Sequence, residues 1–206
     1  MTLLEARRRI LELGQDIVDV GDVAARLGVS TGYASKILSR LQRHQAATRL
    51  AGGTWAITDP VDRLRIPESL VAPALSYISL QTALFHHGMI TQIPEVTYAV
   101  STARTQRIAT PLGVVSIHHI GPEFFSGYAP YGPGSIQMAT PEKALLDVLY
   151  LGPARSRLFA NLPEVELPRS FSIGRARDQI SQIPFESRRA HVRNRFEDLV
   201  RPNRKK

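Results

Sequence analysis

Small polar and basic side chains between residues 30 and 54 have the chemistry needed to contact a polyanion. Lysine and arginine neutralise phosphates, while serine, threonine and glycine allow close approach to the edges of bases. We therefore predict that this segment binds DNA. The candidate contact residues are Ser30, Thr31, Gly32, Ser35, Lys36, Ser39, Arg40, Arg43, Arg49 and Thr54.

The residues from Thr31 to about His44 are predicted to form a helix that presents these side chains, with Ser30 or Thr31 as its cap. At about 100° per residue, an apolar stripe and a basic stripe fall on roughly opposite faces of this helix. A helix that lies in the major groove needs this arrangement, although a basic face is often only a solvated one. The apolar stripe consists of Ala34, Ile37, Leu38 and Leu41, and the other face carries Lys36, Ser39, Arg40 and Arg43.

Further elements are predicted around this helix, namely helices at 3–13 and 19–27 and a hairpin over 47–57. Four residues have the spacing of a helix-turn-helix, in which two helices cross at small residues and the turn is left-handed at a glycine. The hairpin would supply a wing. Together these features favour a winged helix-turn-helix that binds DNA over one that is used only for protein contacts. The spacing residues are Ala24, Gly28, Ala34 and Ile37.

The whole chain is predicted to have an α+β fold in three parts. Residues 1–59 would form the winged helix-turn-helix, and residues 60–76, with three prolines, would be a linker. Residues 77–206 would form a mixed α/β domain. In that domain we predict helices at 80–87 and 141–151, capped by Ser79 and Thr140, and strands at 96–100 and 114–120.

A basic tail ends the chain. Residues 186–206 contain eight basic and three acidic side chains. We predict that this tail is helical and that it adds phosphate contacts to those of the N-terminal domain. The arginines considered for this role are Arg188, Arg189, Arg193 and Arg195.

The composition limits the classes of function. The chain has 206 residues, a net charge of +8 and no cysteine. Excess lysine and arginine suits a polyanionic partner, but many basic proteins bind no nucleic acid. The lack of cysteine excludes disulfides, thiolate nucleophiles and cysteine-ligated zinc. No apolar run reaches the roughly 20 residues that span a bilayer, and the first residues do not resemble a signal peptide. We therefore expect a cytoplasmic protein without a membrane partner.

Other residues that could do chemistry have simpler structural explanations. Two pairs of adjacent histidines, 86–87 and 118–119, would point apart on either a helix or a strand, which disfavours a metal site. Glu142, Lys143 and Asp147 are residue types found in nucleases, but the first two are adjacent in the first turn of a predicted helix. The sequence therefore predicts no metal, no cofactor and no catalytic residue, and the protein is not expected to be an enzyme.

Three segments of the second domain carry a family resemblance. They are Tyr77-Ile78-Ser79-Leu80-Gln81-Thr82-Ala83-Leu84-Phe85-His86-His87-Gly88, Ile93-Pro94-Glu95-Val96 and Ala139-Thr140-Pro141-Glu142-Lys143-Ala144-Leu145-Leu146-Asp147-Val148-Leu149-Tyr150. In combination they resemble the AbiEi family, antitoxins and transcriptional regulators of bacterial abortive-infection toxin–antitoxin operons. With the N-terminal domain, the resemblance covers about residues 3–151 and excludes the basic tail.

The resemblance implies a protein with two tasks. The N-terminal domain would bind inverted repeats upstream of its own operon and repress it, and the C-terminal domain would support antitoxicity and self-association on DNA. The counterpart would be a nucleotidyltransferase-like toxin, opposed in many family members without a stable complex. Two alternatives stay open: an antitoxin that contacts its toxin directly through the winged helix, and an enzyme that acts on nucleic acid through residues 77–150.

Overall fold

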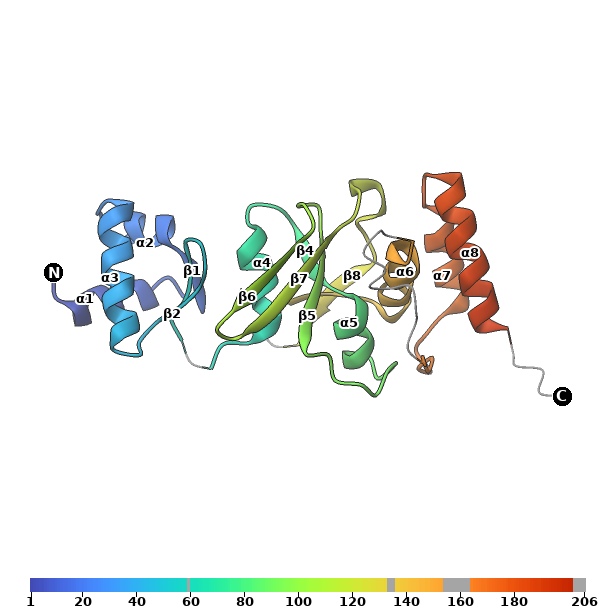
Figure 1. Ribbon diagram of the computed structural model, residues 1–206, viewed down its shortest axis with the longest axis horizontal. Helices are drawn as coiled ribbons and strands as arrows, with labels where there is room; N and C mark the ends of the chain where they lie inside the picture. Colours follow the sequence, from blue (N-terminus) through green and yellow to red (C-terminus); the bar gives the residue numbers. More distant parts are fainter. Residues whose placement is uncertain (59, 133–135, 154–163, 202–206) are drawn as a thin grey trace.

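The computed structural model describes residues 1–58, 60–132, 136–153 and 164–201. These residues form a mixed α+β fold with one three-stranded and one six-stranded sheet, which confirms the predicted fold class at this level. The molecule is elongated, with the N-terminal helices at one end of its long axis and the C-terminal helices at the other (Figure 1). We refer to residues 1–58 as the N-terminal unit and to the described residues from 60 to 201 as the C-terminal unit.

Three helices of the N-terminal unit begin directly after a capping side chain. They are α1 (Leu3–Leu11), α2 (Val20–Leu27) and α3 (Thr31–Arg43). The side chains of Thr2, Asp19 and Ser30 accept hydrogen bonds from backbone N–H groups of the first turns. Gly28 ends α2 with a φ of 68°, in the left-handed region that favours glycine. The predicted helices are confirmed, with ends that differ by at most two residues.

The three-stranded sheet of the N-terminal unit is covered on both faces. β1 (Ile17–Asp19), β2 (Thr48–Ala51) and β3 (Thr54–Ala56) pair antiparallel in the order β1-β3-β2, and the sequence does not predict β1. Trp55 packs in the core formed with α1, α2 and α3. Its neighbour Ala56 points the other way, into a second core, because side chains alternate along a strand.

The segment predicted to be a linker is partly helical. A short 3-10 helix, η1 (Arg63–Arg65), leads into α4 (Ile66–Val71). Pro67 lies in the first turn of α4, where a missing N–H costs no helical hydrogen bond. The second core contains residues of both units and of α4, which lies between them. Its buried members are Ile17, Leu50, Ala56, Ile66, Val71, Val115 and Ile117.

The six-stranded sheet of the C-terminal unit mixes parallel and antiparallel pairs in the order β6-β7-β5-β4-β9-β8. β5 (Val96–Ser101) and β7 (Gly113–His119) pair in parallel and confirm the strands predicted at 96–100 and 114–120. The sequence does not predict the other four strands. These are β4 (Ser76–Ile78), β6 (Gln106–Thr110), β8 (Tyr128–Tyr131) and β9 (Ile136–Ala139).

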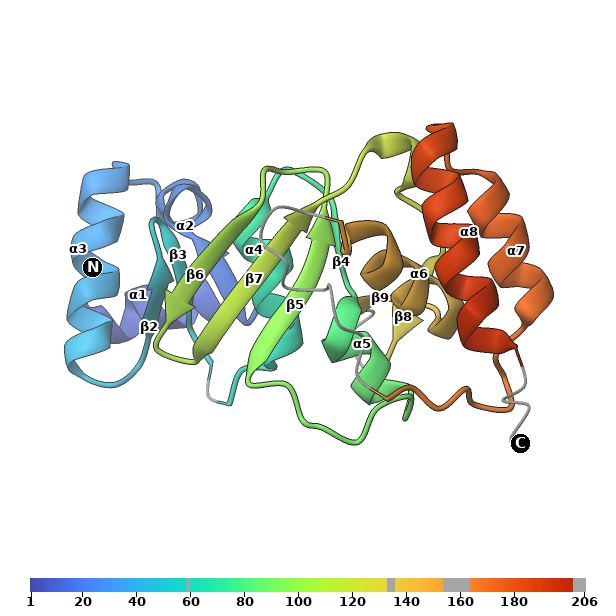
Figure 2. The same ribbon diagram turned by 45° about the vertical axis from the view of Figure 1, so that its right-hand side comes forward.

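The helices of the C-terminal unit include both predicted ones, α5 (Leu80–His86) and α6 (Pro141–Leu151). A 3-10 helix, η2 (Pro122–Phe124), precedes β8. α7 (Ile173–Ser181) and α8 (Glu186–Val200) pack against α6 at the far end of the molecule, so part of the predicted tail is helical (Figure 2). Within the described ranges, no helix is long and apolar enough to cross a membrane.

A buried polar network lies under α5 and α6. The Asp147 carboxylate accepts hydrogen bonds from the Tyr77 hydroxyl at 3.0 Å and the Ser79 hydroxyl at 2.7 Å. It also lies 2.8 Å from the Lys143 ammonium, which donates to the Phe124 carbonyl. Burial lowers the pKa of Lys143, and burial with the nearby Asp147 charge raises the pKa of Tyr77. Ser79 precedes α5 as predicted, but its hydroxyl bonds Asp147 and does not cap the helix.

The predicted start of α6 is confirmed, and Glu142 in its first turn also bonds residues that are far from it in the sequence. The Thr140 hydroxyl accepts a hydrogen bond from the backbone N–H of Lys143. Glu142 is buried and accepts hydrogen bonds from the Ser172 N–H and the Arg175 guanidinium, which ties α7 to α6. Burial alone would raise the pKa of Glu142, but these bonds outweigh it and hold the pKa below its ordinary value.

Candidate nucleic-acid interface

The exposed face of α3 carries three cationic side chains and no anionic one. Lys36, Arg40 and Arg43 are exposed and make no hydrogen bond or ion pair with the residues that the structure describes. An arginine or lysine in this state keeps its full set of donors for a phosphate or a base edge. The apolar stripe on the opposite side is buried as predicted, and it consists of Ala34, Ile37, Leu38 and Leu41.

The small residues of α3 form an open surface at its first turn. Thr31 and Gly32 are exposed, and a Cβ atom added to Gly32 would meet nothing within 4 Å. The Ser30 hydroxyl accepts a backbone N–H bond as the cap, and the Ser39 hydroxyl donates to the Ser35 carbonyl at 2.8 Å. Each of these hydroxyls can still bond a further group, because a hydroxyl both donates and accepts.

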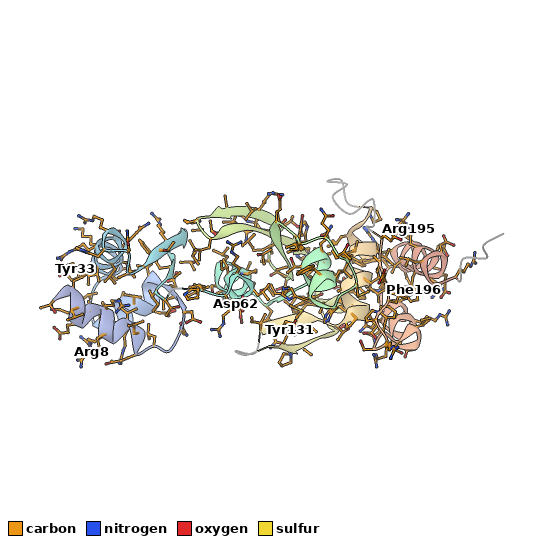
Figure 3. All side chains as sticks on the ribbon, turned by 90° about the horizontal axis from the view of Figure 1, so that it is seen from below. Arg8, Tyr33, Asp62, Tyr131, Arg195 and Phe196 are labelled. Carbon is orange, nitrogen blue, oxygen red and sulfur yellow. The ribbon has the colours of Figure 1, made fainter. Side chains whose placement is uncertain are left out.

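Tyr33 belongs to this face, although the sequence argument did not include it. Its side chain is 47% exposed and lies on the outer side of α3 (Figure 3). Arg40 follows Tyr33 after about two helical turns, so the two side chains lie along the same side. A tyrosine hydroxyl can bond a phosphate oxygen. The available signal was a large aromatic residue outside the apolar stripe of the helix.

The structure separates the two candidate residues of the hairpin. Arg49 is the cross-strand partner of Trp55, and its guanidinium lies 5.8 Å from the centre of the Trp55 ring, on the face toward α3. Its Nε atom also donates to the Gly52 carbonyl at 2.9 Å. Thr54 precedes Trp55 and therefore points to the opposite face of the sheet. The geometry thus groups Arg49 with α3 and does not group Thr54 with it.

Acidic side chains of the N-terminal unit lie in a cleft on the Thr54 side. The cleft has a volume of about 350 Å³ and is lined by Asp16, Asp19 and Asp22 together with Glu68 of α4. In contrast, residues 23–58, which contain α3 and the hairpin, include no aspartate or glutamate. Three of the five acids of the N-terminal unit thus lie on the side of the small sheet opposite Trp55, and the other two, Glu5 and Glu12, lie in α1 and at its C-terminal end. The basic residues of the acid-free segment are Arg26, Lys36, Arg40, Arg43 and Arg49.

The arginines of the predicted tail lie at the other end of the molecule from α3 (Figure 1). Arg188 donates to the Tyr150 carbonyl at 2.7 Å and lies over the Tyr150 ring, while Arg189 donates to the Ile183 carbonyl at 2.8 Å. These two side chains hold α8 in place. The other two, Arg193 and Arg195, are exposed. The structure does not bring any of the four together with α3.

The histidine pairs contact groups of their own fold. His87 Nε2 lies 2.7 Å from a backbone carbonyl, and His119 Nδ1 lies 3.1 Å from another. His86 packs against the Tyr131 ring. His118 is buried beside the Ser116 hydroxyl, and burial lowers its pKa to about 4. No three side chains that could bind a metal converge among the described residues.

The candidate interface consists of the residues that the fold gathers on and beside the outer face of α3. No protein-family model matches the chain, and no curated protein matches it. The residues of this candidate interface are Thr31, Gly32, Tyr33, Ser35, Lys36, Ser39, Arg40, Arg43 and Arg49.

Proposed function

We propose that the chain is a DNA-binding transcriptional regulator whose N-terminal unit is a winged helix-turn-helix. α3 would enter the major groove, and the β2–β3 hairpin would be the wing beside it. The observation that carries this proposal is the separation of charge in the N-terminal unit. The outer face of α3 offers three cations without partners among the described residues, in a segment that has no acid, while Asp16, Asp19 and Asp22 line a cleft on the other side of the small sheet.

Different residues would contribute affinity and sequence preference. Lys36, Arg40 and Arg43 neutralise phosphates and release counterions, which gives most of the affinity. The open first turn at Thr31 and Gly32 lets the helix approach base edges closely, where sequence is read. Arg49 would contact the DNA backbone from the hairpin with its remaining N–H donors, because its Nε–H already bonds the Gly52 carbonyl.

We further propose the role suggested by the family resemblance, an antitoxin that represses its own toxin–antitoxin operon. The support comes from segments 77–88, 93–96 and 139–150. Tyr77 and Ser79 of the first segment bond Asp147 of the third in the protein interior, so these residues have a structural use and no access to substrate. This favours a non-enzymatic C-terminal unit. The counterpart would be a nucleotidyltransferase-like toxin, opposed with or without direct contact.

The test is binding of the purified protein to the DNA upstream of its own gene and to a scrambled duplex, each across a salt series. We expect a preference for the upstream DNA and an affinity that falls steeply with salt. The variant Lys36→Ala/Arg40→Ala/Arg43→Ala should lose this binding and remain folded. The charge-matched control Arg8→Ala/Arg63→Ala/Arg169→Ala changes three exposed arginines away from α3.

The outcomes separate the proposal from its rival. Equal affinity for both duplexes would indicate that a basic surface binds DNA without sequence preference, and it would contradict the proposed regulatory function. A triple variant that binds DNA normally but no longer neutralises a co-expressed toxin would favour the docking role of the winged helix. Loss of DNA binding with antitoxicity intact would show that the two tasks belong to different units.

A further inference from the structure

The C-terminal unit contains a second long segment without acids. Residues 96–122, which include β5, β6 and β7, contain no aspartate or glutamate. The two arginines of this segment are Arg104, just before β6, and Arg107 within it. Neither arginine belongs to the proposed recognition helix or to the hairpin.

The fold places this segment beside the acid-free part of the N-terminal unit. β6 is the edge strand of the six-stranded sheet and lies against β2 (Figures 1 and 2). Ile108 of β6 packs at the core that contains Leu50 of β2. Residues 23–58 and 96–122 are therefore neighbours in space, although they are far apart in the sequence.

The basic side chain of β6 points away from the shared core. Ile108 faces that core, so its neighbour Arg107 faces the other side of the sheet, with its cross-strand partner Ser116. Seen from below, α3 and the β6–β7 strands lie along one side of the molecule, and α1 and α2 lie along the other (Figure 3). Arg107 therefore projects on the side on which α3 lies.

Arg104 and Arg107 are available to a ligand. Both are exposed, and neither makes a hydrogen bond or ion pair with another described residue. The exposed residues that flank Arg107 on the same side of the strand, Thr105 and Ala109, are small. A guanidinium in such a place binds a phosphate without displacing a larger side chain, and its planar fork suits two phosphate oxygens.

We propose that Arg104 and Arg107 bind the phosphate backbone of the same duplex that α3 contacts, at nucleotides flanking the site read by α3. This inference rests on the proposed function of the N-terminal unit. Phosphates of one DNA strand follow each other at about 3.4 Å along the axis, and a five-residue strand such as β6 extends about 17 Å. The edge of the sheet thus lengthens the footprint and adds affinity that is independent of sequence.

The experiment compares two duplexes with the same centre, one just covering the site of α3 and the hairpin and one longer by about one helical turn on each side. The full-length protein, Arg104→Ala/Arg107→Ala and the control Arg8→Ala/Arg169→Ala are titrated across a salt series. On the long duplex, the first variant should bind more weakly, and the slope of log affinity against log salt should be shallower by about two. On the short duplex it should equal the wild type, and the control should equal the wild type on both.

The inference and the proposed function fail in different ways. An unchanged salt slope on the long duplex would overturn the flanking contact and leave the recognition helix untouched. An equal loss on both duplexes would also overturn it, because the contact would then lie within the central site. A wild-type protein without preference for its upstream DNA would remove the proposed function and this inference together. Equal thermal unfolding temperatures of the variants and wild type exclude misfolding as the cause.

Discussion

The Lys143 ammonium and the Asp147 carboxylate lie 2.8 Å apart inside the C-terminal unit, with only 1% and 0% of their side chains exposed. Both belong to α6, one helical turn apart. Desolvation of two charges is costly, and hydrogen bonds from Tyr77 and Ser79 offset part of that cost at Asp147. The pair is therefore sensitive to the loss of one partner.

Asp147→Ala should lower the free energy of unfolding by about 3–5 kcal/mol, because it leaves the Lys143 charge buried without its partner. Urea unfolding monitored by circular dichroism measures this. The double variant Lys143→Met/Asp147→Leu removes both charges and should be clearly more stable than the single variant. Equal stability of the two variants would contradict a role for the ion pair itself.

His118 should make the fold sensitive to acid. Its pKa in the folded state is lowered from 6.5 to about 4, because burial disfavours the charged ring. Between these two values the unfolded chain binds more protons, so the free energy of unfolding falls as the pH falls through that window. At about 1.4 kcal/mol per pKa unit, the loss is at most about 3.5 kcal/mol. Urea titrations at several pH values measure it. His118→Gln should show a smaller loss, and an unchanged pH dependence would assign the effect to other groups.

Ile66 should couple the two units. Ile66→Ala removes apolar volume from the core that α4 shares with both sheets, and we expect a loss of about 2–4 kcal/mol. Limited proteolysis should then cut faster between the units, near residues 58–63. Leu75→Ala is the control, since Leu75 is 63% exposed and its removal should cost little. Equal effects of both substitutions would contradict a shared core.

Replacement of Gly32 by alanine should raise the stability of the fold and weaken DNA binding. Gly32→Ala places a methyl group in open space on a helix, where alanine is favoured by up to about 1 kcal/mol. If α3 approaches base edges at this point, the same methyl group should weaken DNA binding by about tenfold, the size of one lost base contact. Thermal unfolding and DNA titration measure the two effects. Gly174→Ala in α7 is the control, with a similar gain in stability and unchanged DNA binding.

Elements with local signals could be predicted from the sequence. α2, α3 and α6 have capping side chains at Asp19, Ser30 and Thr140, and helix propagation depends on neighbours in sequence. Short strands lack such signals. β4 is three residues long, and its pairing with β9 joins Ile78 to Met138, a contact that no local pattern reveals. α4 was missed because it is short, contains Pro67 and lies close to Pro73, which together resemble a connecting segment.

The candidate site was predictable where it depends on one helix. The periodicity of α3 indicates which residues are buried and which are outside, and the structure agrees. The alternation of side chains next to the core residue Trp55 was the signal that could have excluded Thr54. That α4 covers the Thr54 face of the sheet could not be predicted, because it depends on contacts between the two units. The contact between β2 and β6 could not be predicted either, because it depends on how the two units pack, and the residues involved are far apart in the sequence.

The core shared by the two units also limits how the protein can be divided. Ile17, Leu50 and Ala56 line the face of the small sheet that α4 and β7 cover. A fragment that ends at residue 58 would present this face to water and lose its stabilising contacts. The N-terminal unit is therefore not a portable module that can be excised or fused to another protein alone. A transplant that preserves its shape must carry α4 and the β5–β7 strands with it.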